Sequence, residues 1–386
     1  LACLWKRGGG EDDPVFIQWD SSDRSHYKKL QDHALFSPDL KQVLTYGGKT
    51  ACLWDAATGS PVGKVLIAGG TILRAVFNPD GTSLLTCDKD DEARLWNLAT
   101  DKFISLPHEE AVHGGAFSGD GKKILTGGED KSLKLWNSAT GEESGEPVET
   151  GLNITKTLLS PDGERMAALG SNGGFKLYSM DKGVPKPLTK ADKGVKNIIF
   201  SADSRTFLLV TGSMAALFDA KTGKALLNLK HGSALSGALL SPDGKTAATL
   251  GADGNIRLWD LKTGLPVGNA LKHEGAIQDC AFSPHGEALI AAYQDGGWQW
   301  WDTQTGEAIG EETWQGALVR EMGFEPGGKS LLMLGKDGAL TKVDADWVDP
   351  QADPDRLLLA SQVAGRCQVN SLGSLDPVPA DQWVRL

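Results

Sequence analysis

The residues that could support catalysis are seven histidines, five cysteines and 50 acidic residues, and their spacing decides what chemistry they can do. A zinc protease site would show a His-Glu-x-x-His motif, and a structural zinc site would show paired Cys-x-x-Cys motifs. A serine nucleophile on a strand-to-helix turn would show Gly-x-Ser-x-Gly. The 386 residues contain none of these motifs and no kinase catalytic or Mg-binding signature. The spacing therefore predicts no catalytic residue, no metal site and no cofactor.

Repeated Asp-Gly pairs and Gly-rich pieces are the remaining candidates for ion or phosphate binding. The pairs include Asp253-Gly254, Asp295-Gly296 and Asp337-Gly338, but they lack the alternating oxygen ligands and the distal Glu of a calcium loop. The glycines at 8–10 and 47–48 lack the lysine and the following helix of a phosphate loop. We therefore interpret both as turns and connections.

The charge and apolar content limit the partners and the location of the chain. It has 39 basic and 50 acidic residues, a net charge of −11, and the acidic residues are spread along it, so we do not expect nucleic acid as a partner. No apolar run approaches the roughly 18 residues of a membrane helix. Cys3 and Cys52 occupy matching places in two repeats, which indicates buried strand residues rather than disulfides and is compatible with a cytoplasmic location.

Two markers recur along the chain every 40 to 42 residues. The first marker is a large residue, usually aromatic, at the end of an alternating strand: Trp54, Trp96, Trp136, Tyr178, Phe218, Trp259, Trp301 and Val343. The second is a large apolar residue before a Ser-Pro-Asp-Gly-like turn: Phe36, Phe77, Phe117, Leu159, Phe200, Leu240, Phe282 and Phe324. Such a fixed period is typical of repeat folds.

Each repeat predicts a small antiparallel sheet. In the repeat at residues 112–136, two apolar runs flank the turn at Gly119-Asp120-Gly121, which predicts a hairpin. A third strand follows at residues 133–136, and Thr140-Gly141 turns the chain toward a fourth, outer strand. A four-stranded sheet cannot bury both faces alone, but sheets packed face to face around an axis can. The sequence therefore predicts an all-β propeller of eight repeat units.

The residues around the aromatic marker also carry a family resemblance. Leu95-Trp96-Asn97, Leu135-Trp136-Asn137, Leu258-Trp259-Asp260 and Trp300-Trp301-Asp302 each follow a Ser-Pro-Asp-Gly-like turn by about 20 residues. This pattern resembles WD40 repeats, and the resemblance covers roughly residues 1–345. It implies a structural role for some residues, namely a hydrogen-bonded set of His, Ser or Thr, Asp and Trp in each sheet.

The resemblance implies two complete sets of this kind, which we call tetrads. They are His108, Thr126, Asp130 and Trp136, and His231, Thr249, Asp253 and Trp259. A third, with His273, Asp295 and Trp301, lacks the hydroxyl because Ala291 stands in its place. The set with Thr86, Asp90 and Trp96 lacks the histidine.

The domain boundaries allow two interpretations. Residues 1–345 form one propeller with eight blades, closed by a strand near residues 14–19, or 1–59 are the end of an upstream propeller and seven blades follow. Residues 346–386 are expected to be a tail with a short helix, which Asp353 caps and Pro354 begins. Asp353-Pro354-Asp355-Arg356-Leu357 and Ala380-Asp381-Gln382-Trp383 resemble the tail of bacterial, planctomycete-type serine/threonine protein kinases that contain WD40 repeats. This resemblance implies a piece of a larger signalling protein.

Residues about four positions before the second marker are expected near the mouth of a central channel, and they vary in charge and size. The candidates for binding a protein or peptide are His113, Thr155, Lys196, Ser236, Gln278 and Glu321. The favoured function is a non-catalytic interaction scaffold or sensor, monomeric as a module. The alternative is a propeller hydrolase, for which the channel mouth offers only Asp32, His113 and Glu321.

Overall fold

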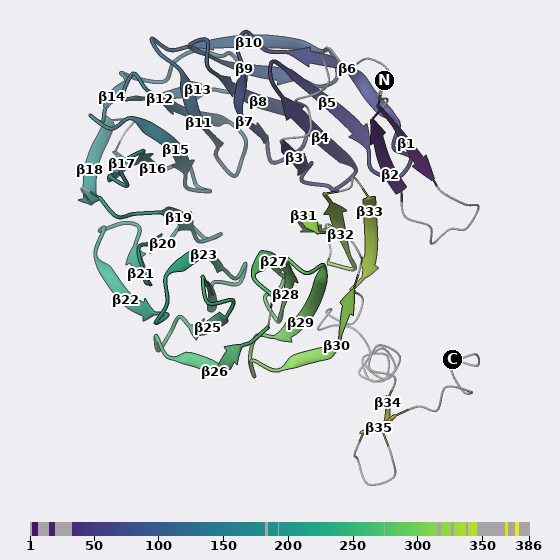
Figure 1. Ribbon diagram of the computed structural model, residues 1–386. Coiled ribbons are helices and arrows are strands. Elements are labelled where there is room, and N and C mark those ends of the chain that lie inside the picture. The colour runs from purple at the N-terminus through teal and green to yellow at the C-terminus, as the bar shows by residue number, and fades with distance from the viewer. Residues whose placement is uncertain are drawn as a thin grey trace. The chain divides into compact units, whose positions relative to one another are not determined.

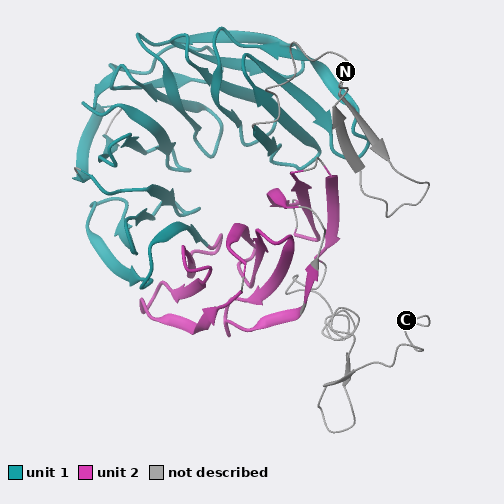
Figure 2. Ribbon diagram, viewed as in Figure 1, with its two compact units in different colours: residues 1–240 teal, residues 241–386 magenta. Residues whose placement is uncertain are grey.

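Every regular element that the structure describes is a β-strand. The computed structural model describes residues 33–345, apart from 182, 183, 192, 274, 315–317, 326, 327, 337 and 338, and the backbone of 2–6, 15–19, 367–369 and 375–377. It divides into a first unit, residues 1–240, and a second unit, residues 241–386 (Figure 2). The helix expected after Asp353 lies outside the described residues, and the propeller and tail boundaries stay predictions.

The first unit holds five four-stranded sheets, each built from four consecutive strands paired antiparallel (Figure 1). The first two are β3 (His33–Phe36), β4 (Gln42–Gly47), β5 (Thr50–Asp55) and β6 (Pro61–Ile67), then β7 (Ile72–Phe77), β8 (Ser83–Asp88), β9 (Glu92–Asn97) and β10 (Lys102–Pro107). The third is β11 (Val112–Phe117), β12 (Lys123–Gly128), β13 (Ser132–Asn137) and β14 (Val148–Glu149). The last two are β15 (Ile154–Leu159), β16 (Arg165–Gly170), β17 (Phe175–Asp181) and β18 (Val184–Ala191), then β19 (Asn197–Phe200), β20 (Thr206–Val210), β21 (Met214–Asp219) and β22 (Ala225–Lys230).

Three further strands complete the first unit, and the second unit repeats the same pattern. β1 (Ala2–Lys6) pairs with β2 (Val15–Trp19), and β23 (Leu235–Leu240) ends the first unit. The second unit has β24 (Thr246–Gly251), β25 (Ile256–Asp260) and β26 (Pro266–Leu271), then the sheet of β27 (Ile277–Phe282), β28 (Ala288–Tyr293), β29 (Gly297–Asp302) and β30 (Ala308–Trp314). It ends with β31 (Val319–Phe324), β32 (Ser330–Gly335) and β33 (Ala339–Asp344), and with the hairpin of β34 (Cys367–Val369) and β35 (Leu375–Pro377).

The core lies between neighbouring sheets. Leu85, Leu95 and Leu106 of the second sheet pack in one cluster with Ile124 and Trp136 of the third, and all five are buried. Strands β8 and β12 are buried along nearly their whole length, because both faces of each middle strand meet a neighbouring sheet. Complete burial of one such leucine or isoleucine stabilises the fold by about 1.5–3 kcal/mol. The sheets therefore depend on one another for stability.

A buried serine organises the hairpin turn that the second marker precedes. In the fourth sheet, the Ser160 hydroxyl accepts a hydrogen bond from the backbone N–H of Arg165 (2.9 Å) and donates to the carboxylate of Asp162. Gly163 closes the turn with φ of +68°, as the sequence predicted. The equivalent serines are buried in five other repeats: Ser37, Ser118, Ser201, Ser241 and Ser283. The conformation of this turn therefore depends on the serine as well as on Pro and Gly.

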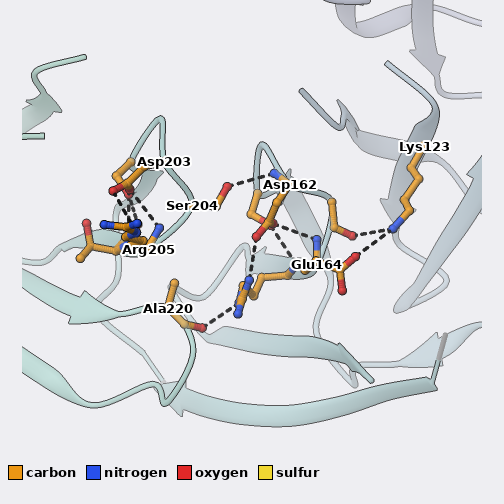
Figure 3. A network of polar contacts seen from close by, with 12 residues as sticks. Lys123, Asp162, Glu164, Asp203, Ser204, Arg205 and Ala220 are labelled. Carbon is orange, nitrogen blue, oxygen red and sulfur yellow. Dashed lines mark hydrogen bonds and ion pairs between the residues drawn. The ribbon is translucent and has the colours of Figure 1, made fainter. Parts of the chain in front are cut away.

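These turns also join consecutive sheets of the first unit (Figure 3). The N–H of Asp162 donates to the hydroxyl of Ser204 in the next turn (2.9 Å), and Lys123 Nζ donates to the carbonyl of Gly163 (3.1 Å). Arg165 Nε donates to the carbonyl of Ala220 (3.1 Å) in the following sheet. Three sheets are thus connected by polar contacts as well as by the apolar core.

We predict that Ser160→Ala lowers the free energy of unfolding by about 1–3 kcal/mol, because the N–H of Arg165 and the carboxylate of Asp162 both lose a buried partner. Urea unfolding followed by circular dichroism measures the change. The matched control is Ser213→Ala at an exposed serine, with an expected change within about 0.5 kcal/mol. Equal effects of the two substitutions would contradict the role of the turn serine.

Candidate functional site

Three of the candidate partner-binding residues lie at irregular positions in the first strands of the sheets. His113, Thr155 and Gln278 are each the extra residue of a β-bulge, in β11, β15 and β27. Lys196 directly precedes β19, and Ser236 is the second residue of β23. A bulge turns its side chain away from the regular alternation of the strand and is common next to functional sites. The structure thus places four of the candidates, those at residues 113, 155, 196 and 236, on successive first strands of the first unit.

Glu321 is the exception. The sequence analysis grouped it with the other candidates, but it does not lie at the equivalent position of its strand. In β31 the bulge residue is Arg320, and Glu321 pairs with Leu334 one position further along. The difference of one position matters because the residue at a bulge and the residue after it can differ in burial. In the second unit the residue after the β27 bulge is Asp279, whose pKa is raised to about 6 by burial although the N–H of Cys280 donates to it.

The candidate side chains differ in chemistry and in their own contacts. His113 Nε2 lies 2.9 Å from the exposed carboxylate of Glu129, and Thr155 Oγ1 donates to the carbonyl of Leu169 (3.2 Å). Lys196 Nζ donates to the carbonyl of Leu235 (3.0 Å) at the start of the next first strand. Thr155, Lys196 and Ser236 are exposed, whereas Gln278 is half-buried. The surface therefore offers an imidazole, hydroxyls and an ammonium on a repeated backbone frame.

Two cations on the same first strands were missed by the sequence analysis. Arg74 of β7 and Lys156 of β15 each follow directly after the bulge of their strand. Arg74 Nε donates to the carbonyl of Gly115 (3.2 Å), and Lys156 Nζ donates to Asn197 Oδ1 (2.6 Å). The sequence does contain a signal for both, because each stands three residues before the second marker. The sequence analysis considered only the residues about four positions before that marker.

The tetrad of the third sheet is a chain of short hydrogen bonds. Trp136 Nε1 donates to Thr126 Oγ1 (2.7 Å), so the hydroxyl hydrogen of Thr126 is directed to His108 Nε2 (2.7 Å). His108 Nδ1–H then donates to Asp130 (2.7 Å), and the side chains of His108 and Asp130 are 0% and 5% exposed. Burial by itself would raise the pKa of Asp130, but the hydrogen bonds from His108 and from the N–H of Ser132 lower it to about 2.

The second tetrad is divided between the two units. His231 is buried in the first unit, and Trp259 Nε1 donates to Thr249 Oγ1 (2.8 Å) in the second. The placement of His231 relative to Thr249 and Asp253 stays a prediction. The pair of an indole N–H and a threonine hydroxyl recurs at Trp96 with Thr86 (2.9 Å) and also at Trp54 with Thr45 (2.8 Å). Thr45 was not expected in this role, although it has the same position in its strand.

In the sheet of β27–β30 the missing hydroxyl is replaced from a different position. Trp301 Nε1 donates to the phenol oxygen of Tyr293 (3.3 Å), two residues after Ala291 on the same strand. The ring of His273 stacks on that of Tyr293 with centroids 3.5 Å apart. Burial raises the pKa of the Tyr293 phenol well above its usual value. Ala291 thus leaves this set without the Ser or Thr hydroxyl, as the sequence indicated, and the longer tyrosine side chain supplies the acceptor instead.

Near the same sheet, three side chains among the described residues lie close enough to share a metal ion. His273, Asp295 and Glu312 each offer one ligand atom, and these atoms lie within 4.8 Å of one another. However, the N–H of Gly275 donates to His273 Nδ1 (2.8 Å), which places the proton of a neutral imidazole on Nε2. Nε2 then donates to Glu312 (2.6 Å) and has no lone pair for a metal. The group therefore fits a hydrogen-bonded cluster better than a cation site.

Comparison with known proteins agrees with this geometry. Residues 59–97, 102–137, 223–260 and 266–302 match the WD40 family (WD domain, G-beta repeat). The C-terminal WD40 domain of Sif2 has a TM-score of 0.63, 17% identity, and covers 81% of this chain and 94% of its own. The computationally designed Ika8 protein has a TM-score of 0.64, 19% identity, and covers 82% and 98%. Together with the sheets, these matches define the fold class as an all-β, eight-bladed β-propeller.

Four segments of the chain match one family within that class. They carry WD40 repeats, as the sequence predicted, and the fold is similar to that of a WD40 domain. It is 25% identical to Protein tipD of Dictyostelium discoideum over 59% of this chain and 39% of that protein. It is 31% identical to Telomerase protein component 1 of Rattus norvegicus over 28% of this chain and 4% of that protein. The chain thus matches less than half the length of either relative.

We predict that the contribution of Asp130 to stability depends on pH. Its pKa of about 2 in the folded state lies below its ordinary value of 3.8, so the stabilisation is complete above about pH 5 and is lost as the pH falls toward 2. Asp130→Asn should cost about 1–2 kcal/mol at pH 7 and progressively less in acid, measured by urea unfolding across pH. The control, Glu110→Gln at an exposed position, should show no such trend.

We also predict that zinc does not stabilise the protein through His273. A site with a Kd of about 1 μM would add roughly 2.7 kcal/mol at about 100 μM Zn²⁺, which raises Tm by several degrees. We expect Tm to change by less than about 1 °C at that concentration. A larger rise that His273→Ala abolishes would show that the imidazole changes its tautomer and binds the metal.

Proposed function

We propose that this propeller is a non-catalytic scaffold that binds a protein or peptide across the first strands of its sheets. WD40 propellers typically serve as protein-interaction scaffolds. The observation that carries the proposal for this chain is the pair of β-bulges at His113 and Thr155, followed by Lys196 directly before the next first strand. At these places a repeated backbone presents three different side chains. Variation of the side chain on a constant frame is what selective recognition of a partner requires.

Two observations support binding over hydrolysis. A propeller hydrolase would gather carboxylates and histidines on the first strands, but His113 makes its polar contact with Glu129, in the loop after β12. Asp32 lies outside the described residues. The group formed by His273, Asp295 and Glu312 lies on loops and the fourth strand of its sheet, and its imidazole tautomer does not favour a metal.

The wider setting of the scaffold is also part of the proposal. The resemblance of residues 353–357 and 380–383 to the tails of WD40-containing bacterial kinases supports a place in a larger signalling protein, and these residues lie outside the described ones. The lengths of the two curated relatives support a longer parent chain as well. No helix in the described residues is long and apolar enough to cross a membrane. We propose a cytoplasmic location and a monomeric module.

A site-specific photo-crosslinker tests the proposal. With p-benzoylphenylalanine in place of the exposed Thr155, we expect specific proteins of the source-cell lysate to be captured, and Lys196→Glu to reduce their capture several-fold. The control places the crosslinker at Lys221, an exposed turn residue after β21. Circular dichroism confirms that each variant is folded. Equal capture at both positions, or none at Thr155, would contradict binding at the first strands.

A further inference from the structure

The outer strand β10 of the second sheet has an unpaired edge. It is the last strand of its sheet, and within the described residues it pairs with β9 alone (Figure 1). The N–H of His108, directly after β10, donates to the carbonyl of Asp91 (2.9 Å). Because alternate residues of an antiparallel strand bond to the same neighbour, Phe103 and Ser105 direct their N–H and carbonyl groups away from β9. These backbone groups are available to a further strand.

The other outer strands of the first unit carry features that discourage the addition of a strand. β6, β18 and β22 each have a register shift in their pairing, and β18 also contains Pro185 and Pro187. β14 has only two residues. Bulges, prolines and short strands are common means of protecting a sheet edge. β10 instead pairs with β9 along its whole length without a shift, so its backbone is the best suited of these to further pairing.

An aromatic side chain is exposed beside these backbone groups. The side chain of Phe103 contacts Trp96 opposite it on β9, with ring centroids 4.8 Å apart, and is still 45% exposed. Arg94 Cζ lies 4.4 Å from the centroid of the Phe103 ring, and Arg94 Nη1 donates to the carbonyl of Ile67 in β6 (2.8 Å). The equivalent positions of β6, β18 and β22 carry Pro61, Pro187 and Ala225. Phe103 is thus packed on one side and offers an apolar surface on the other.

A lysine lies at each end of the edge. Lys102 is the first residue of β10 and is exposed. At the other end, Lys134 of the third sheet donates from Nζ to the carbonyl of Pro107 (3.1 Å). Neither lysine forms an ion pair within the part of the chain that the structure describes. Since successive side chains of a strand alternate between its faces, Lys102 lies on the opposite face of β10 from Phe103.

We propose that β10 binds an extended segment of a partner protein, which adds to the second sheet as a fifth, antiparallel strand. The residue of the segment opposite Phe103 is apolar, and the residues on its other face are acidic because they meet Lys102. A second copy of this chain fits less well, since each copy has a net charge of −11. The surface is separate from the candidates on the first strands, because β10 is the fourth strand of its sheet.

Fluorescence anisotropy with labelled hexapeptides tests the proposal. The probe alternates valine and glutamate, so that its valines pack beside Phe103 and its glutamates lie on the face of Lys102. In that arrangement the valine N–H groups face β10, and the glutamate N–H groups face away. N-methylation of the glutamates should therefore preserve binding, and N-methylation of the valines should abolish it. Equal binding of the two methylated peptides would overturn the proposal.

A probe of reversed charge tests the contribution of Lys102 and Lys134. It alternates valine and lysine and keeps the same apolar face. At low ionic strength, where charge interactions are least screened, we expect it to bind at least about threefold more weakly than the glutamate probe. Binding as tight as that of the glutamate probe would show that the segment is not recognised by its acidic residues.

Two substitutions of one residue test the edge in the protein itself. Ser105→Pro removes the outward N–H, whereas Ser105→Ala keeps it, and both remove the hydroxyl that donates to Glu92. A proline is tolerated at an edge position whose N–H faces solvent. We expect Ser105→Pro to bind the glutamate probe about three- to tenfold more weakly than Ser105→Ala, with circular dichroism showing that both are folded. Equal affinity of the two variants would contradict strand addition at β10.

Hydrogen exchange and sedimentation identify the place and the occupant. The bound glutamate probe should slow exchange of the Phe103 and Ser105 amides and leave that of Asn228 in β22 unchanged. Absence of this protection would refute the assignment to β10. Without peptide, we expect the protein to sediment as a monomer. A dimer that persists in Ser105→Ala and is lost in Ser105→Pro would identify a second copy as the occupant and refute the partner segment.

Discussion

Five of the sheets share one constraint on which their strand pairing depends, namely an acceptor for the indole N–H of the marker tryptophan on the third strand. A buried N–H without an acceptor costs about 1–3 kcal/mol, so each such sheet must place an oxygen beside it. Four sheets use a threonine hydroxyl of the second strand, at Thr45, Thr86, Thr126 and Thr249. The sheet of β27–β30 uses the phenol of Tyr293. The need for an acceptor is thus constant, and the residue that provides it varies.

This constraint fixes the backbone geometry of one part of each sheet. In another part of the sheet the side chains can vary. The tryptophan and its acceptor fix the pairing of the second and third strands, and the buried turn serine fixes the hairpin between the first and second. The bulge near the start of the first strand lies beyond both. Side chains there, such as His113 and Thr155, contact Glu129 and the carbonyl of Leu169 within their own sheets, and they take no part in the pairing of the tryptophan with its acceptor.

Much of the fold could be predicted from the sequence, because its two markers are residues that the sheets need for burial and turn geometry. The hairpin around Gly163 and the strand ending at Trp136 are local features of a few adjacent residues. The site was harder to predict. Glu321 was misassigned by one residue, because it stands three rather than four positions before Phe324, and the role of Tyr293 depends on the reach of a long side chain across a strand. Arg74 and Lys156 directly follow the bulges of their strands, and the sequence analysis considered only the bulge positions.

The glycine pair of β11 has a consequence for how such a surface changes over evolutionary time. Because Gly114 and Gly115 contribute packing through their backbone alone, the third sheet holds its neighbours together without adding a chemical preference to the exposed surface. New specificity can then arise by exchange of surface residues around these glycines, such as His113 and Thr155, while the glycines themselves remain unchanged. The residues that pack the sheets and the residues that could recognise a partner can thus change independently, although they are neighbours.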